Sequence, residues 1–365
     1  MNILMITRPL GSPWNEGGKN LAYGIAKNIK NHRIHLLVRK NFNEKVNNNV
    51  VLHRIYPSSH KRKISYIEKL KLFLFLLKVK NINIYHFIYT PELYSSIINK
   101  LLMKLKSKKS IQTIPTTIKK ISNIRKLIFS NKVVAISDFT RNLLLKKGIK
   151  NVIKINTGID TNYFKPFKKD LTLLNKLGLY KKFIIFAPID LEKEKGSRII
   201  LKLIKDTRHL KNIVFIFSYR ATKKRILEEK YLKSNLIKMG LSKRVLFIKD
   251  SKDIRNLINI SDIIIYSAVD TYEKHEIPMI LIESMSMEKP IIIFDVAPIN
   301  EIIKKNEGIK IRNYLTIKKT ILKFANNKNL VNKLGKLARK RIVSNFNIIK
   351  TAEEYEELYD NIHKK

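Results

Sequence analysis

One short stretch of the chain combines acidic residues and a histidine between two apolar runs. A polar loop follows the apolar segment from Ile263 to Tyr266, and Glu283 stands a few residues beyond it among apolar neighbours. The acids and the histidine of this loop are Asp270, Glu273, His275 and Glu276. Carboxylates accept hydrogen bonds and a histidine can accept or donate one, so the pattern suits a ligand that carries hydroxyl groups.

The elements that must position these side chains are a strand, a helix and a second strand. Ile263 to Tyr266 is short and rich in β-branched residues, which is typical of a strand buried on both faces. Pro278 opens the predicted helix, where its missing N–H costs nothing. Pro290 ends that helix, and Ile291 to Phe294 forms the next strand. Ligands of open α/β sheets bind outside the carboxyl ends of the strands, so Glu283 is expected beside a ligand site.

Residues 261–302, taken together, resemble the nucleotide-sugar signature of the family 4 retaining glycosyltransferases, which have the GT-B fold. That signature contains a Glu, seven residues and a second Glu, followed by Gly-x-Pro and an apolar strand. Glu283 matches the second Glu, and Glu288-Lys289-Pro290 stands at Gly-x-Pro. The position of the first Glu is occupied by His275.

The resemblance implies a role for each matched position. Glu283 would accept hydrogen bonds from the ribose hydroxyls of a nucleotide-sugar donor. Backbone N–H groups at Met279 and Ile280 would contact the donor diphosphate. His275 or Glu276 would face the sugar as the catalytic residues.

Two glycine-containing turns supply further candidates for phosphate binding. Gly17-Gly18 lies at a predicted strand-to-helix turn, where backbone N–H groups can approach an anion. A flexible turn is the alternative interpretation of these glycines. Lys195-Gly196 precedes another predicted helix, where an ammonium group adds to the helix dipole. The family has a glycine pair and a Lys-Gly at these places, which implies contact with the donor phosphates.

Three positions depart from the family pattern. Besides His275, Pro115 stands where many members carry a histidine near the reacting carbon. The region around Asp190 lacks the arginine that holds the donor phosphates in the family. These departures keep open a second interpretation, in which the chain is a degenerate GT-B protein that binds a nucleotide-sugar or a partner without turnover.

Predicted strands and helices alternate in two blocks, which is typical of doubly wound α/β domains. The blocks meet at Asn156 to Pro166, which is rich in turn residues and resembles the linker of the same family. We therefore predict two Rossmann-like domains, the first over residues 1–160 and the second over residues 161–345. The resemblance implies that they face a central cleft as acceptor and donor domains. It also implies that a helix within residues 346–365 crosses back to the first domain.

Composition sets the broad class of the protein. The chain has 365 residues, enough for two buried cores, and its hydrophobic content of 44% is that of a globular protein. The absence of cysteine excludes disulfides and thiolate chemistry and fits a reducing compartment. No signal peptide or membrane-spanning apolar run is found in the sequence, so we expect a cytoplasmic protein.

The chain is strongly basic, with a formal net charge of +45. Residues 1–165 contain 32 Lys and Arg against 6 Asp and Glu, a balance of +26. Such a surface favours polyanions: nucleic acid, anionic lipid or a phosphorylated acceptor. A nucleic-acid-binding protein is therefore a third interpretation. Against it, the sequence contains no RNA-recognition, helix-turn-helix or zinc motif, and its basic residues are spread along the chain.

A basic and apolar segment in the first half allows two interpretations. Lys61-Arg62-Lys63 precedes a predicted helix from Ile64 to Val79. That helix is either a core helix with solvated lysines or a peripheral helix on the inner face of the membrane. In the second case Leu72, Phe73 and Phe75 would insert into the lipid.

The resemblance implies transfer of a sugar from a nucleotide-diphosphate-sugar to a hydroxyl acceptor, with retention of the anomeric configuration. A glycan or a lipid-linked glycan is the expected acceptor. No metal or other cofactor is implied, because Lys195 and the backbone N–H groups near Gly17 and Gly18 would stabilise the leaving diphosphate.

Overall fold

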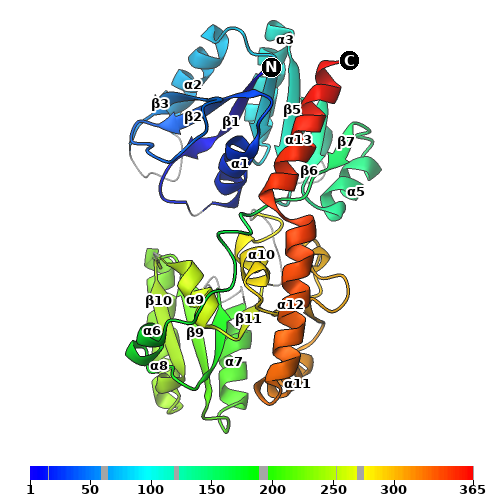
Figure 1. The fold of residues 1–365 in the computed structure, drawn as a ribbon. Coiled ribbons are helices and arrows are strands. Elements are labelled where there is room, and N and C mark those ends of the chain that lie inside the picture. Colours follow the sequence, from blue (N-terminus) through cyan, green and yellow to red (C-terminus); the bar gives the residue numbers. More distant parts are fainter. Residues whose placement is uncertain are drawn as a thin grey trace. The chain divides into compact units, whose positions relative to one another are not determined.

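The computed structural model describes residues 1–14, 16–58, 65–118, 123–188, 196–251, 253–268 and 275–364. The chain divides into two compact units. Unit 1 contains Met1–Asp160, Thr271–Pro278 and Asn345–Lys365, and unit 2 contains Thr161–Asp270 and Met279–Ser344. Each unit holds one parallel β-sheet with helices packed on it (Figure 1).

The sheet of unit 1 has seven strands in the order β3-β2-β1-β4-β5-β6-β7, and every pairing is parallel. Its strands are β1 (Asn2–Leu10), β2 (Arg33–Arg39), β3 (Val50–Tyr56), β4 (Ile84–Ile88), β5 (Lys109–Ile114), β6 (Lys132–Ala135) and β7 (Val152–Lys154). The strand order reverses between β1 and β4. Loops that follow these two strands therefore separate and leave room for a ligand at the carboxyl edge.

The helices of unit 1 are α1 (Gly17–Asn28), α2 (Tyr66–Lys78), α3 (Leu93–Lys106), α4 (Ile124–Leu127), α5 (Asp138–Lys146) and α13 (Ile348–His363). The C-terminal helix α13 returns to the first unit, as predicted, and packs beside α1. A buried polar network fixes it there. The ring of His86 contacts the hydroxyl groups of Tyr359 at 2.7 Å and Thr113 at 2.8 Å, and Thr113 contacts Tyr355 at 2.9 Å. His86 is thus a packed histidine.

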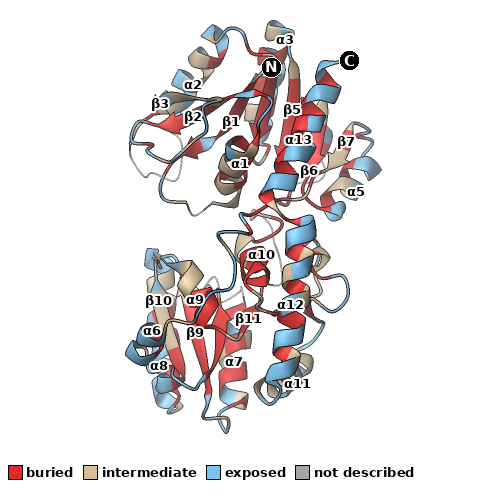
Figure 2. Ribbon diagram, in the orientation of Figure 1, coloured by how far each residue is buried: buried red, intermediate tan, exposed pale blue. Residues whose placement is uncertain are grey.

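The sheet of unit 2 has six parallel strands in the order β10-β9-β8-β11-β12-β13. They are β8 (Phe183–Ala187), β9 (Ile213–Tyr219), β10 (Val245–Lys249), β11 (Ile263–Tyr266), β12 (Ile291–Phe294) and β13 (Gly308–Ile311). The strands of both sheets are largely buried, whereas most of the helices expose their outer faces and α10 is buried (Figure 2). Burial on both faces explains why these strands are nearly continuous apolar runs in the sequence.

The helices of unit 2 are α6 (Leu171–Lys176), α7 (Arg198–Asp206), α8 (Lys223–Lys238), α9 (Ile254–Ile260), α10 (Met279–Ser286), α11 (Tyr314–Ala325) and α12 (Lys328–Asn345). Short 3₁₀ turns cover Ser242–Arg244 and Ile299–Ile302. Among the described residues of the whole chain, no helix is long and apolar enough to cross a membrane.

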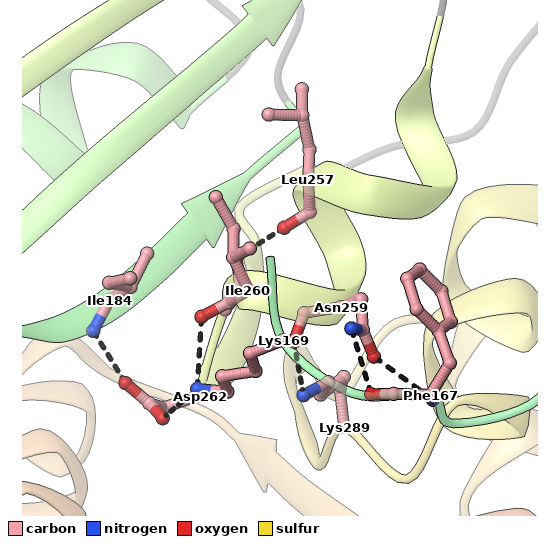
Figure 3. Close-up of polar contacts among 9 residues, drawn as sticks. Phe167, Lys169, Ile184, Leu257, Asn259, Ile260, Asp262 and Lys289 are labelled. Carbon is pink, nitrogen blue, oxygen red and sulfur yellow. Dashed lines mark hydrogen bonds and ion pairs between the residues drawn. The ribbon is translucent and has the colours of Figure 1, made fainter. Parts of the chain in front are cut away.

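A polar network fixes the segment that enters unit 2 (Figure 3). The Asp262 carboxylate accepts hydrogen bonds from the Ile184 N–H at 2.7 Å and from Lys169 Nζ at 3.0 Å. The Asn259 side chain donates to the Phe167 carbonyl at 3.0 Å. The entering segment is therefore tied to α9 and β8 before the first helix of the unit begins.

Candidate functional site

The carboxyl edge of unit 1 carries the glycine pair at the start of α1. Gly17 is the first residue of the helix, and the preceding Glu16 makes no capping hydrogen bond with its side chain. The Glu16 carboxylate instead pairs with Arg8 at 2.9 Å. The first N–H groups of a helix have no partner within the helix, and the helix dipole makes that end positive. The N–H groups at Gly17 and Gly18 are therefore suited to bind an anion.

His275 lies directly against this helix start. A Cβ placed on Gly17 would be 2.5 Å from His275 Cδ2, so only a glycine leaves room for the ring. The backbone of His275 bridges to Thr116, beyond the end of β5. The close approach of Gly17 and His275 brings together two residues that the sequence predicted as parts of the site.

The hydrogen bonds of His275 define its tautomer. Nδ1 lies 2.6 Å from the Ile277 carbonyl oxygen, which can only accept, so Nδ1 carries the hydrogen. Nε2 is consequently an acceptor, and it is buried without a hydrogen-bond partner. Burial lowers the pKa of His275 to about 4, although the hydrogen bond to Ile277 opposes that shift. The ring is therefore neutral near pH 7 and presents one unused lone pair.

The Glu276 side chain is held by hydrogen bonds within unit 1. Its buried carboxylate accepts hydrogen bonds from the hydroxyl of Ser137, at 2.6 Å, and from that of Thr140. Its backbone N–H donates to the Pro115 carbonyl at 3.0 Å. Ser137 caps α5 and Thr140 lies in its first turn. Because both oxygens already accept hydrogen bonds, this geometry favours Glu276 as an anchor of the segment that carries His275.

Unit 2 places Glu283 on the buried helix α10. The residue is 9% exposed, and its carboxylate has no hydrogen-bond or ion-pair partner among the residues that the structure describes. Burial raises its pKa from 4.5 to about 7. Met279 and Ile280 form the first turn of the same helix, as expected from the sequence. A carboxylate that is buried and unpaired is prepared to accept hydrogen bonds from a ligand.

Gly196 lies at the carboxyl edge of the sheet of unit 2, just before α7. Its φ of +95° is in the region that favours glycine, and a Cβ there would lie 2.2 Å from both Ser267 O and Ser267 Oγ. Ser267 follows β11 and is 1% exposed, and its hydroxyl is buried without a partner. Sequence reasoning missed Ser267. Its one visible signal is a small polar residue at the end of a central strand.

The Gly-x-Pro match has a backbone explanation. Glu288 stands at the glycine position with a φ of +58°, which a glycine adopts without strain. Four residues of the expected site region, Asp190, Lys195, Asp270 and Glu273, lie outside the described residues. Within the described part of the chain, no group of three or more His, Asp or Glu side chains could hold a metal ion.

The profile of one known family matches part of the second half of the chain. The profile of the family described as "Glycosyl transferases group 1" matches residues 172–341. This match confirms the resemblance to group 1 glycosyltransferases over that region, and the narrower assignment to family 4 stays a prediction. No curated protein sequence matches the chain.

Solved structures confirm the fold over the whole chain. The Anabaena protein Alr3699/HepE, solved in complex with UDP, has a TM-score of 0.78 at 15% identity, covering 99% of this chain and 100% of that one. A glycosyltransferase from Rickettsia africae has a TM-score of 0.76 at 19% identity, covering 100% and 99%. Sucrose-phosphate synthase from Thermosynechococcus elongatus has a TM-score of 0.74 at 12% identity, covering 99% of each chain. The predicted α/β class and GT-B fold are thereby confirmed.

Proposed function

We propose that this chain, whose residues 172–341 match the group 1 glycosyltransferases, transfers a sugar from a nucleotide-diphosphate donor to a hydroxyl acceptor. The proposal includes retention of the anomeric configuration and no requirement for a metal. The proposal rests on one observation, the environment of the Glu283 carboxylate. This carboxylate is buried and unpaired on α10, at the position where the family signature has its ribose-binding acid.

The donor would be held by unit 2. Glu283 would accept hydrogen bonds from the two ribose hydroxyls. The diphosphate would lie at the start of α7, where Gly196 allows a close approach of the backbone, and Lys195 would add a charge. Backbone N–H groups at Met279 and Ile280 would complete its binding. Together they would stabilise the charge that develops on the leaving diphosphate.

The sugar would be recognised from unit 1 by His275. Its Nε2 has a free lone pair, so it can accept a hydrogen bond from a sugar hydroxyl, as the carboxylate of the family would. Glu276 would hold the segment in place through Ser137 and Thr140. The N–H groups of Gly17 and Gly18 would face the phosphates.

A lipid-linked acceptor and a peripheral location on the membrane belong to the same proposal. The expected insertion of Leu72, Phe73 and Phe75 is wrong, because these side chains are partly buried and pack on the core of unit 1. The basic triplet 61–63 lies outside the described residues. Exposed apolar side chains instead line the outer faces of α2 and α3: Tyr66, Ile67, Leu70, Leu74, Leu77, Leu93, Tyr94, Ile97, Ile98, Leu101 and Leu105.

These two helices lie side by side on one face of the sheet. Both contribute to one apolar cluster beneath them, and Lys106 Nζ donates to the Leu77 and Val79 carbonyls at 2.6 and 3.0 Å. Exposed lysines flank the apolar faces, including Lys71 and Lys100. An apolar face bordered by lysines is complementary to an anionic lipid surface.

The proposal is tested by a donor screen. The protein is incubated with several nucleotide-sugars, UDP-sugars first because Alr3699/HepE was solved with UDP and UDP-glucose. Each is supplied with and without polyprenyl-phosphate-linked acceptors, and the released nucleotide is measured. Glu283→Ala should weaken donor binding about a hundredfold, because two hydrogen bonds to a charged group are lost. Donor binding without turnover for any donor or acceptor would favour the degenerate binding protein.

A further inference from the structure

Unit 1 buries a cationic group that the proposed reaction does not use. Arg39 is the last residue of β2 and is 6% exposed, and its Nε is buried without a hydrogen-bond partner. Throughout the described ranges, no carboxylate or other acceptor contacts its guanidinium. A buried charge is costly unless it is paired, so an anion bound beside this side chain would stabilise it.

The position of Arg39 is that of a ligand-binding residue. It ends a strand next to β1, at the carboxyl edge of the parallel sheet, where ligands of such sheets bind. Its stem is fixed by Gly11, which follows β1 with a φ of +133°. A Cβ on Gly11 would lie 3.2 Å from Arg39 Cδ. The glycine therefore lets the methylene stem lie flat against the loop backbone and holds the guanidinium in one place.

Three acids of the neighbouring segments already form ion pairs or hydrogen bonds with other groups. Glu16 pairs with Arg8 at 2.9 Å. The Glu44 carboxylate accepts a hydrogen bond from Trp14 Nε1 at 2.7 Å. Glu68 of α2 accepts the Ser65 N–H at 2.7 Å as part of its capping box. None of the three pairs with Arg39, and no other acid among the described residues of the unit forms an ion pair with it.

The neighbouring polar side chains carry hydrogen-bond donors. Tyr56 pairs with Arg39 across β2 and β3, so both side chains leave the same face of the sheet. The Tyr56 hydroxyl is fully buried and has no partner. A second buried cation, Lys19, donates hydrogen bonds from its ammonium group to the carbonyls of Gly11 and Pro13, at 2.7 and 3.1 Å. Among the described residues, the region thus offers an unused hydroxyl donor beside the charge of Arg39.

We propose that Arg39, supported by the Tyr56 hydroxyl, binds a phosphoryl group at the carboxyl edge of β2. A guanidinium presents paired N–H groups that match the oxygens of a phosphate. Identifying this phosphate as part of the acceptor rests on the proposed function, in which unit 1 receives the acceptor. The anion site itself does not depend on that function.

The test measures binding of inorganic phosphate to the full-length chain by calorimetry at constant ionic strength and without nucleotide. Arg39→Met keeps the stem and removes the charge, and it should weaken binding about tenfold to a hundredfold. Tyr56→Phe should weaken it several-fold. Arg33→Met is the matched control, because Arg33 is the exposed arginine at the opposite end of the same strand. It should leave the affinity unchanged.

The ligand-free proteins separate a binding role from a structural one. Arg39→Met should melt at no lower temperature than the wild type, since it removes an unpaired buried charge. If Arg39→Met fails to fold, Arg39→Lys keeps the charge but loses the paired donors, and it should still weaken phosphate binding. An Arg39→Met protein that melts lower and binds phosphate as before would overturn the proposal. So would equal losses in Arg39→Met and Arg33→Met, which would show a general attraction to a basic surface.

Two further arms identify the source of the phosphoryl group and keep the two proposals apart. Glycerol 3-phosphate tests a soluble ligand, and vesicles with phosphatidic acid, compared with neutral vesicles, test a lipid headgroup. Binding of either glycerol 3-phosphate or phosphatidic acid vesicles supports the site if that binding is lost in Arg39→Met. Displacement of phosphate by UDP would place it in the donor site and overturn the proposal. Failure of the donor screen together with Arg39-dependent phosphate binding would reject only the enzymatic function.

Discussion

The buried carboxyl group of Glu283 makes the stability of unit 2 depend on pH. Its pKa in the folded chain is about 7, above the ordinary 4.5, because burial disfavours the ionised form. The folded state therefore binds this proton more tightly than the unfolded state does. The resulting stabilisation is complete below pH 4.5 and is lost as the pH rises to 7.

Glu283→Gln should therefore stabilise the ligand-free protein at pH 8. The glutamine stays neutral, so the gain should reach up to about 3 kcal/mol, and it should vanish at pH 4. Denaturant unfolding at the two pH values measures it. The same variant should bind the nucleotide-sugar less tightly. A gain that is equal at pH 4 and pH 8 would show that the carboxyl group is not the cause.

The role of His275 as a hydrogen-bond acceptor can be tested by removing the acceptor and then restoring it with a carboxylate. Removing its acceptor in His275→Ala should lower the transfer rate about tenfold while the binding of nucleoside diphosphate alone stays unchanged. His275→Glu should recover much of the rate, because a carboxylate accepts the same hydroxyl hydrogen. Since the pKa of His275 is about 4, its charge should not change the wild-type rate between pH 5 and pH 8. Equal losses of transfer and diphosphate binding in His275→Ala would indicate packing instead.

Residue types alone could not reveal which of these side chains lack a partner. The sequence predicted Glu283, His275 and both glycine turns as candidates, because their neighbours in the chain form a recognisable pattern. Arg39 and Ser267 have no such local signature. Their importance lies in burial without a hydrogen-bond partner, and burial depends on strands that are distant in the sequence.

At the scale of elements, the segment that carries His275 depends on α5. We expect Thr140→Val, which removes one hydroxyl contact to Glu276, to lower transfer and to leave nucleoside diphosphate binding intact. Its effect should be strongly non-additive with Glu276→Gln, because both changes break one contact. Thr320→Val on α11 is the control for the substitution itself. If Glu276 contacts the sugar directly, Glu276→Gln will reduce transfer and Thr140→Val will not.

Most elements followed from the sequence, whereas the orientation of α2 did not. The helix is apolar on nearly all sides, so its periodicity could not distinguish the face that meets the sheet from the face that meets solvent. Leu72 and Phe73 turn toward the core and Leu70 turns outward. The strand β13 was missed because its four residues include a glycine and a lysine, which weaken the pattern.

At the scale of the whole molecule, the outer faces of α2 and α3 should bind anionic vesicles. Replacing Ile67, Leu70 and Leu101 with serine should weaken binding more than about tenfold, because apolar area no longer leaves water. Binding should also weaken with salt, and neutral vesicles should bind poorly. Cosedimentation measures each effect.

The matched control for this prediction lies on α8 of unit 2. Leu227, Tyr231 and Ile237 are exposed there among lysines, as on α2 and α3. Their replacement with serine should leave vesicle binding unchanged. If the protein ignores anionic vesicles at low salt, or if the two triple variants behave alike, the apolar faces of α2 and α3 have another purpose and the acceptor is soluble.

The place of α13 has a consequence for the order in which the protein is made. Unit 1 contains the first 160 residues and also the segment from Asn345 to Lys365. A ribosome delivers that segment after all of unit 2. The surface that receives Tyr355 and Tyr359 is therefore synthesised long before its partner, while all of unit 2 emerges in between. Domains generally fold as units during synthesis, and here unit 1 begins before unit 2 and is completed after it.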